Sequence, residues 1–406
     1  MRHSVSISFL FRTFAAAICS ETMKEYITIK NFGPLINIVN LELKQFTILI
    51  GESASGKSTL MKLVAMMRYL YKMANIRSYL YRSKITKSPF RIRLDKMIQR
   101  QGMIKMFTKE SLIVYRVQMD DGVSYEVRIE NGSLKKTEVI EPRHLMLCKD
   151  SYISENRNII PTWVQTSWKN KGATIGFYFH ETNDDFGRAS EGDKELSMGF
   201  VGMKMIITHP KGKPTRYQIV PIDNHHAPIE LTEASSGIQT SAPLALIVDY
   251  FAKDFSFKEA FKRSVMSYLF EAENLDKFNS VTEPTALTKV VDIHIEEPEL
   301  SLFPDAQCKL VEDVFYTAIH AESDRTLNMM LATHSPYILN YLNIVLNQTK
   351  EGRTKLTNEN LAVYGIHNGS TMNLLMKNDK GQDVVDTFDL TEKMSAIYNE
   401  YTELTK

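Results

Sequence analysis

The sequence has few cysteines. Three occur in 406 residues, at Cys19, Cys148 and Cys308, and they lie far apart with no CxxC pair and no neighbouring histidine at ligand spacing. This pattern argues against a disulfide framework and against a zinc site. It is typical of a reducing compartment, so we expect a cytoplasmic protein.

The sequence also lacks long apolar runs, a charge excess and repeats. No stretch of about 18 apolar residues occurs, so we expect no transmembrane helix and no membrane partner. The formal net charge of +1 gives no preference for nucleic acid or lipid as a partner. Without a sustained heptad pattern, a long coiled-coil arm is not expected. The 43% hydrophobic content is enough to form a sizeable core.

Residues 1–22 resemble a signal peptide, with a basic start and an apolar middle that Arg12 interrupts. Met23 opens the text MKEYITIKNFG, which leads directly into the first expected strand. We therefore interpret residues 1–22 as a leader from a misassigned start, and residues 23–406 as the folded protein. A genuine export signal is the alternative.

The stretch GESASGKST matches the P-loop pattern G-x-x-x-x-G-K-[ST]. It follows the apolar run FTILI and precedes a stretch with helical spacing that begins at about Lys57. Glycines let successive backbone N–H groups turn toward phosphate oxygens, and the helix presents its positive end to the same anion. The expected nucleotide-binding residues are Gly51, Ala54, Ser55, Gly56, Lys57, Ser58 and Thr59.

A second motif is VVDIHIEEPELSLFP, an apolar strand that ends in two adjacent carboxylates. At the end of such a strand, Glu296 is expected to approach Mg²⁺, and Glu297 can orient or deprotonate an attacking water. The alternative interpretation is a solvated acidic turn. Asp292, two residues earlier on the same strand, is a poorer candidate for the metal.

Two further stretches complete the set. LATHSPYIL is a second apolar strand, and it ends in His334, whose imidazole could contact a γ-phosphate if the strand lies beside the one bearing Glu296. SSGIQ precedes an apolar helical run, and a helix start with serine and glycine can bind an anion. A simple N-cap is the alternative there. The expected second anion site comprises Ser235, Ser236, Gly237 and Gln239.

The order P-loop, SSG-Q, EEPE and His resembles the ATP-binding-cassette ATPase superfamily. It is most similar to the soluble branch that contains structural-maintenance-of-chromosomes proteins and overcoming-lysogenization-defect ATPases, on the phrases ITIKNFGPLINIVNLELKQFTILIG and IEEPELSLFP. The resemblance covers roughly residues 23–66 and 229–406. It implies an α/β fold, an ABC-type P-loop ATPase head with a mixed central sheet and an inserted helical plus β-hairpin lid over residues 68–228.

The resemblance also implies roles for the motif residues. Lys57 would bind phosphate, Ser58 and Glu296 would hold Mg²⁺, Glu297 would be the catalytic base and His334 the switch. The SSGIQ residues would face ATP held by a second copy, which implies a homodimer or higher oligomer. Ile238 and Ala54 replace glycines common in the family, and the second change is expected to be harmless. The glutamine that often links metal to lid stays open among Gln99, Gln118 and Gln165. Arg157, in the phrase SYISENRNII, would approach the nucleotide, support the lid or lie on the surface.

The segment 68–109 is strongly basic, with twelve Lys or Arg against one acid, Asp95, and interleaved tyrosines. Such a segment can bind nucleic acid, an acidic protein or the rest of the chain. Arg82, Arg91, Arg93 and Lys96 are the candidate contacts.

We expect an ATP-binding switch with Mg²⁺ that dimerises and controls a separate effector protein, a nuclease in bacterial antiphage systems of the Septu or PARIS kind. Asp383, Asp386 and Asp389 are expected to be surface acids and not a built-in nuclease. The alternative is a DNA-repair or chromosome-maintenance ATPase that binds DNA through residues 68–109. A transporter subunit and a small-substrate kinase fit the motif set less well.

Overall fold

The computed structural model describes residues 23–85, 92–165, 176–223, 227–266, 286–348 and 356–404. Residues 1–22 and Arg91 lie outside this range, so the expectations made for them are not addressed. The chain alternates helices and strands around a mixed sheet, which confirms the α/β fold class. Its helices are α2 (Lys57–Arg82), α3 (Leu94–Arg100), α4 (Ile160–Gln165), α5 (Phe177–Ala189), α6 (Ser236–Lys253), α7 (Phe257–Phe261), α9 (Pro304–Ile319), α10 (Pro336–Asn347) and α11 (Phe388–Leu404).

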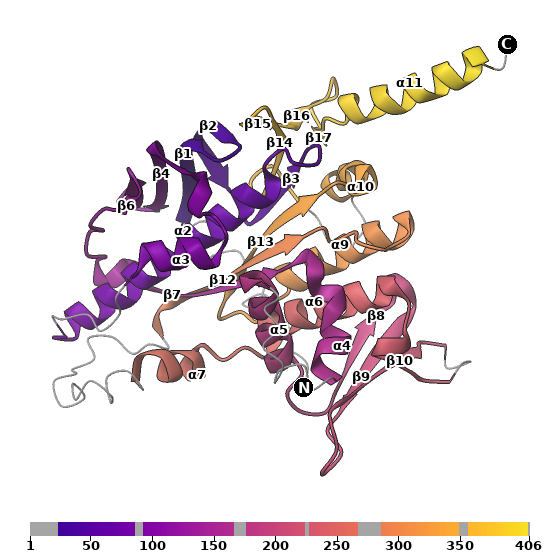
Figure 1. Ribbon diagram of the computed structural model, residues 1–406, viewed down its shortest axis with the longest axis horizontal. Coiled ribbons are helices and arrows are strands. Elements are labelled where there is room, and N and C mark those ends of the chain that lie inside the picture. The colour runs from indigo at the N-terminus through magenta and orange to yellow at the C-terminus, as the bar shows by residue number, and fades with distance from the viewer. Residues whose placement is uncertain are drawn as a thin grey trace, which may run out of the picture.

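A six-stranded sheet forms the centre of the molecule (Figure 1). In spatial order its strands are β15 (Ser370–Asn373), β14 (Leu361–His367), β3 (Phe46–Ile50), β13 (Thr326–Thr333), β12 (Thr288–Glu296) and β7 (Met146–Ile153). All neighbouring pairs are parallel except β14 with β15. The apolar strands β3, β12 and β13 are buried almost throughout, as expected for parallel strands covered on both faces.

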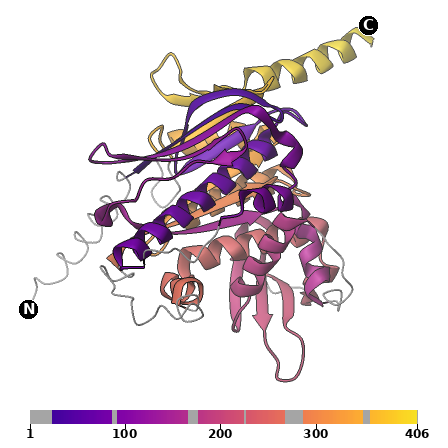
Figure 2. The same ribbon diagram turned by 60° about the vertical axis from the view of Figure 1, so that its left-hand side comes forward.

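A second, antiparallel sheet covers α2. Its order is β2 (Leu35–Leu43), β1 (Met23–Phe32), β4 (Phe107–Met119), β5 (Ser124–Glu130) and β6 (Ser133–Leu134). The turns that join β4 to β5 and β5 to β6 fall at the sequences DDG and ENG, which favour hairpins. In Figure 2, α2 runs between this sheet and the central one. The side chains of α2 and of both sheets form one continuous hydrophobic core.

The opposite face of the central sheet carries α6, α9 and α10, which share a second core with α5 and a small sheet. That sheet has the order β11 (Ile229–Glu230), β10 (Arg216–Pro221), β9 (Met203–Thr208) and β8 (Lys194–Met198). The sequence from about residue 140 to about Pro228 reads as irregular and turn-rich, so α5 and these strands were not predicted.

Residues 68–228, expected as an inserted lid, contribute most of α2 and strands of both large sheets. Helix α2 passes Arg68 without a break, β4 pairs with β1, and β7 pairs with β12 in the central sheet. The division into a leader, a head and a lid stays a prediction.

The C-terminal part closes the sheet and then leaves it. After β14 and β15, the hairpin β16 (Leu375–Lys377) and β17 (Asp383–Val385) leads into α11, which projects away from the body (Figure 1). None of the described helices is long and apolar enough to cross a membrane.

Candidate functional site

The P-loop connects β3 to α2, as the sequence predicts. Both glycines of the motif are sterically required. A Cβ on Gly51 would lie 2.6 Å from the Ile366 carbonyl oxygen, and a Cβ on Gly56 would lie 2.9 Å from Leu35 Cδ2. Gly56 also has a φ of +106°, which side-chain-bearing residues rarely adopt. The tight loop therefore depends on glycine at these two positions.

Ala54 was expected to replace glycine without consequence, because it keeps the backbone amide. Its effect on nucleotide binding stays a prediction, and the structure adds a feature of the backbone. Ala54 has a φ of +64°, in the left-handed region. In that region the Cβ of an L-residue crowds the following carbonyl, at a cost of about 1 kcal/mol. The loop therefore stores backbone strain that the sequence did not reveal.

Lys57 begins α2 and is nearly buried, with 5% of its surface exposed. Its Nζ donates to the carbonyl oxygens of Gly51 at 2.8 Å and of Glu52 at 2.9 Å. Burial lowers the pKa of Lys57, and Glu297 and Glu299 oppose that shift. No acid occupies the first turn of α2, so nothing there competes with an anion for the helix dipole. Ser58 is exposed beside Lys57, and Thr59 is half-buried.

Glu296 ends β12 and is buried, with 3% exposed. Its Oε1 lies 3.3 Å from Lys62 Nζ, and its Oε2 is buried with no hydrogen-bond partner among the described residues. Burial, together with the neighbouring Glu155 carboxyl, raises the pKa of Glu296 to about 7. A buried oxygen without a donor fits a divalent cation, since hard cations take carboxylate oxygens. Ser58 precedes Lys62 by one turn of α2, so both lie on the helix face toward Glu296.

Glu297 and His334 face each other at the carboxyl ends of two adjacent parallel strands, β12 and β13. His334 Nε2 lies 3.8 Å from Glu297 Oε1, and both side chains are more than a third exposed. Glu297 has a φ of +43°, and its backbone N–H donates to the Ala332 carbonyl. The His334 backbone N–H donates to Glu299 Oε1 at 2.6 Å. The expectation that the histidine strand lies beside the glutamate strand is confirmed.

Arg157 settles one alternative left open by the sequence, because it is fully buried and not a surface residue. Its guanidinium donates to the carbonyl oxygens of Glu296 at 2.7 Å, Glu297 at 2.6 Å and Thr240 at 3.0 Å. Burial lowers the pKa of Arg157 to about 10, and the nearby acids limit the shift. One side chain thus ties the EEPE segment to helix α6.

The SSGIQ stretch forms the start of α6. Ser235 is at the N-cap, but its side chain forms no capping hydrogen bond, and Ser235 and Ser236 are both exposed. Gly237 is buried, and a Cβ there would lie 2.7 Å from the Ser301 carbonyl oxygen. Gln239 turns inward and donates to the Thr232 carbonyl at 2.8 Å. The two serine hydroxyls are therefore the accessible part of this stretch.

The basic segment divides into internal and external charges. Arg68 is buried and pairs with Glu25 at 2.8 Å and with Asp292 at 3.3 Å. Asp292 is thus occupied by an arginine and is not available to a metal. Arg82 at the end of α2, Arg93 at the N-cap of α3 and Lys96 on α3 are exposed. The alternative of internal pairing therefore holds for Arg68, and what the three exposed cations contact stays a prediction.

Glu155 lies near the site and was not among the residues predicted from the sequence. Glu155 contacts Glu296, and this contact lowers the pKa of Glu155. Glu155 stands two residues before Arg157 in the phrase SYISENRNII, in which only Arg157 was singled out as a candidate.

Of the candidate glutamines, Gln99 is exposed on α3, Gln118 lies on β4, and the Gln165 side chain is outside the described part. Among the C-terminal acids, Asp383 pairs with Lys377 at 2.9 Å, and Asp386 is exposed.

Comparisons with known proteins give a weak structural likeness. No protein-family model and no curated protein sequence matches this chain. Similar solved structures include an SmcHead bound to the C-winged helix domain of ScpA (12% identity, TM-score 0.35), covering 88% of this chain and 99% of that one. Another is an SMC head domain from Thermotoga maritima, with 12% identity and a TM-score of 0.34, covering 88% of this chain and 100% of that one. A third is the recombination mediator protein RecF with ATPrS, with 11% identity and a TM-score of 0.34, covering 88% of this chain and 99% of that one. At these scores the alignments carry no conclusion about ligand or partner.

Proposed function

We propose that this chain is a Mg²⁺-dependent ATPase of the ABC type. One arrangement supports the proposal most. The P-loop follows β3, His334 follows β13, and Glu296 ends β12 with Glu297 directly after it. These are three neighbouring parallel strands. Their carboxyl ends meet at one edge of the sheet, which is where ligands bind in open α/β folds.

The residues at this edge suit phosphoryl transfer to water. Lys57 would exchange its two loop carbonyls for phosphate oxygens of ATP. Ser58 and Glu296 would hold Mg²⁺, which neutralises charge on the phosphates when bound. Glu297 is exposed enough to accept a proton from a water molecule. The oxygen of that water attacks the γ-phosphorus, and the bond from the γ-phosphorus to the β–γ bridging oxygen breaks, so that ADP leaves. His334, close to Glu297 Oε1, would hold that carboxylate in place and contact the γ-phosphate.

We also propose that two copies close around ATP. Ser235 and Ser236 present hydroxyls and the first-turn amides of α6 to solvent. An anion held by another copy could bind there. Arg157 joins α6 to the backbone carbonyls of Glu296 and Glu297, so a shift of α6 on anion binding would move these two residues.

The output we propose is control of a separate effector, a nuclease in antiphage defence within the cytoplasm. The motif order carries this part of the proposal. A DNA-repair or chromosome-maintenance ATPase is the second candidate, and the exposed cations Arg82, Arg93 and Lys96 favour it.

ATP turnover and native mass test the proposal together. We expect the wild-type chain to release phosphate from ATP only with Mg²⁺. Glu297→Gln should lose turnover by at least about a hundredfold while still binding ATP, because it removes the proton acceptor and keeps the shape. With ATP and Mg²⁺, this variant should accumulate as a dimer or larger assembly.

Glu322→Gln is the matched control, since Glu322 is an exposed glutamate on the loop after α9. It should leave turnover unchanged. The ATPase assignment fails if wild-type protein binds no ATP, or if Glu297→Gln turns ATP over at the wild-type rate. The pairing fails if the variant stays monomeric with ATP bound. Co-expression with the genomic neighbours then shows whether a nuclease copurifies.

A further inference from the structure

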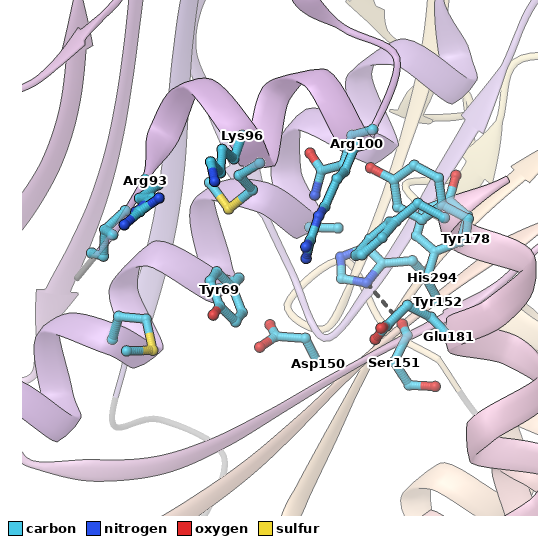
Figure 3. Close-up of a pocket in the computed structure, with 16 residues that line it drawn as sticks. Tyr69, Arg93, Lys96, Arg100, Asp150, Ser151, Tyr152, Tyr178, Glu181 and His294 are labelled. Atoms are coloured by element: carbon cyan, nitrogen blue, oxygen red, sulfur yellow. Dashed lines mark hydrogen bonds between the residues drawn. The ribbon is translucent and has the colours of Figure 1, made fainter. Parts of the chain in front are cut away.

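A cavity of about 570 Å³ opens beside the central sheet, away from the P-loop (Figure 3). It lies between α2, α3, α5 and the edge strand β7. Tyr69 on its wall is twelve residues beyond Lys57 on the same helix, or about 18 Å along the axis. The residues that define its chemistry are Tyr69, Arg93, Lys96, Arg100, Asp150 and Tyr178.

The cavity has a basic side. Lys96 and Arg100 are four residues apart on one face of α3, and Arg93 is the N-cap residue just before this helix. All three line the cavity and are exposed. In Figure 3, Arg100 extends from α3 into the space above Asp150. Two guanidinium groups and one ammonium group suit a phosphate, which they can bind through charge-assisted hydrogen bonds.

The opposite side of the cavity is acidic, and its carboxylate Asp150 lacks hydrogen-bond donors among the described residues. The Asp150 side chain is 14% exposed, and neither of its carboxylate oxygens has a hydrogen-bond partner among the described residues. Its ion pair is with Lys72 Nζ, at the long distance of 3.8 Å. Glu181 lines the same side. A buried carboxylate without donors is costly, so it points to a ligand that supplies N–H groups.

Aromatic rings stand between the two sides. Tyr69 and Tyr178 line the cavity, and Tyr152 packs on Tyr178 with ring centroids 4.1 Å apart. The Tyr178 hydroxyl is buried and has no hydrogen-bond partner in the part of the chain that the structure describes. Behind them His294 is neutral, because burial and the nearby Arg68 lower its pKa to about 3. Tyrosine rings offer flat apolar faces for stacking, and the Tyr178 hydroxyl can hydrogen-bond to a ligand. Both features suit a planar heterocycle.

We propose that this cavity binds one nucleotide unit, distinct from the ATP of the P-loop. Its phosphate contacts Arg93, Lys96 and Arg100. Its base stacks on the tyrosines and presents adjacent N–H donors to Asp150. Guanine carries two such donors side by side on one edge, which matches the two oxygens of a carboxylate that accept no hydrogen bond within the described residues. The unit comes either from a free nucleotide or from a single strand that inserts one base.

The cavity adjoins Glu296, the carboxylate proposed to hold Mg²⁺. Lys62 Nζ lies 3.3 Å from Glu296 Oε1 and 5.3 Å from the centroid of the Tyr178 ring. A base stacked on Tyr178 therefore changes the surroundings of Lys62 and Glu296, and ATP turnover should respond. That response rests on the proposed ATPase activity, whereas binding does not.

Equilibrium dialysis against the full chain tests the site. Lys57→Ala is the background in every sample, so that the P-loop does not contribute. The probes are GMP, AMP, a decamer of thymidines, and the same decamer with one central dG. We expect GMP or the dG-containing decamer to bind, at least about tenfold tighter than AMP or the all-thymidine decamer respectively.

Three variants locate the binding. Arg100→Ala and Asp150→Asn should each weaken it by about tenfold or more, because each removes one end of the recognition. Lys105→Ala, in the same basic segment but outside the cavity, should leave it within about twofold. Circular dichroism melting confirms that each variant is folded.

The outcomes separate cleanly. Binding of GMP alone assigns a free nucleotide, and binding of the dG decamer alone assigns an inserted base. The proposal is overturned if neither probe binds below about 1 mM, or if Asp150→Asn and Arg100→Ala bind as well as their parent. If the wild-type chain hydrolyses no ATP while dialysis still shows this binding, the cavity proposal stands and the catalytic proposal fails.

Discussion

Arg157 Nη2 donates to the backbone carbonyl of Glu297 over 2.6 Å, so a fully buried guanidinium holds the residue proposed as catalytic base. The same side chain reaches Glu296 and Thr240. It contacts carbonyl oxygens and not the reacting groups, so Arg157 is a positioning residue.

Arg157→Lys should lower ATP turnover by about tenfold to a hundredfold and destabilise the fold by about 2–4 kcal/mol. A lysine keeps the charge but cannot bridge three carbonyls, and the unmet acceptors stay buried. Steady-state kinetics should show kcat falling more than KM rises, since phosphate contacts remain. Arg143→Lys, at an exposed arginine, serves as the control. Equal loss in both variants would contradict the positioning role.

Ala54→Gly should stabilise the nucleotide-free protein by about 0.5–1 kcal/mol. Glycine adopts the observed φ of +64° without the Cβ penalty, and its greater freedom in the unfolded chain offsets part of the gain. Thermal unfolding measures the change. Ala54→Val should shift the melting temperature the other way, because a β-branched residue fits this region worst. A lower melting temperature for Ala54→Gly would show that the strain is not there.

The motifs themselves were predictable because each is local. GESASGKST, placed between an apolar run and a helical one, was enough to locate Lys57 at the start of α2, and Glu296 and His334 were expected at strand ends. The burial of Arg157 and Arg68 was not predictable. Their partners are far along the chain, as when Arg157 meets Glu296 and Arg68 meets Asp292, and a single sequence carries no record of such pairing. Strand β7 was missed for the same reason.

Gly237→Ala should destabilise the protein by about 1–3 kcal/mol. The added Cβ would lie 2.7 Å from a backbone oxygen of Ser301, so the segment after Glu297 has to shift. Chemical denaturation measures the loss, and ATP-dependent assembly of the Glu297→Gln variant should weaken with it. Gly187→Ala is the control, because its Cβ enters open space inside α5 and should be neutral or stabilising. If the two substitutions behave alike, the close approach is not what constrains this glycine.

Asp150→Asn should stabilise the ligand-free protein at neutral pH by about 1–3 kcal/mol. Burial raises the pKa of Asp150 to about 6, against an ordinary value of 3.8, so the folded chain holds its proton to higher pH than the unfolded chain. Stability from this group is complete below about pH 4 and is lost as pH rises through about 6. The variant should therefore match wild type at pH 4 and exceed it at pH 7.

Urea denaturation at several pH values measures this difference. Asp184→Asn, at an exposed aspartate on α5, should show no comparable change between pH 4 and 7. An Asp150→Asn protein that is less stable than wild type at pH 7 would mean that Lys72 compensates the carboxylate. A side chain that costs stability while it binds a ligand is what the cavity proposal requires.

The pairing of Arg68 with Glu25 on β1 and with Asp292 on β12 has a mechanical consequence. Helix α2 cannot slide along the central sheet without pulling a buried charge away from one carboxylate or the other, which is strongly unfavourable. The same buried guanidinium thus fixes the register of α2 against both sheets at one point, halfway along the helix. Phosphate binding at the first turn of α2 would therefore act on a helix whose middle is anchored to both sheets.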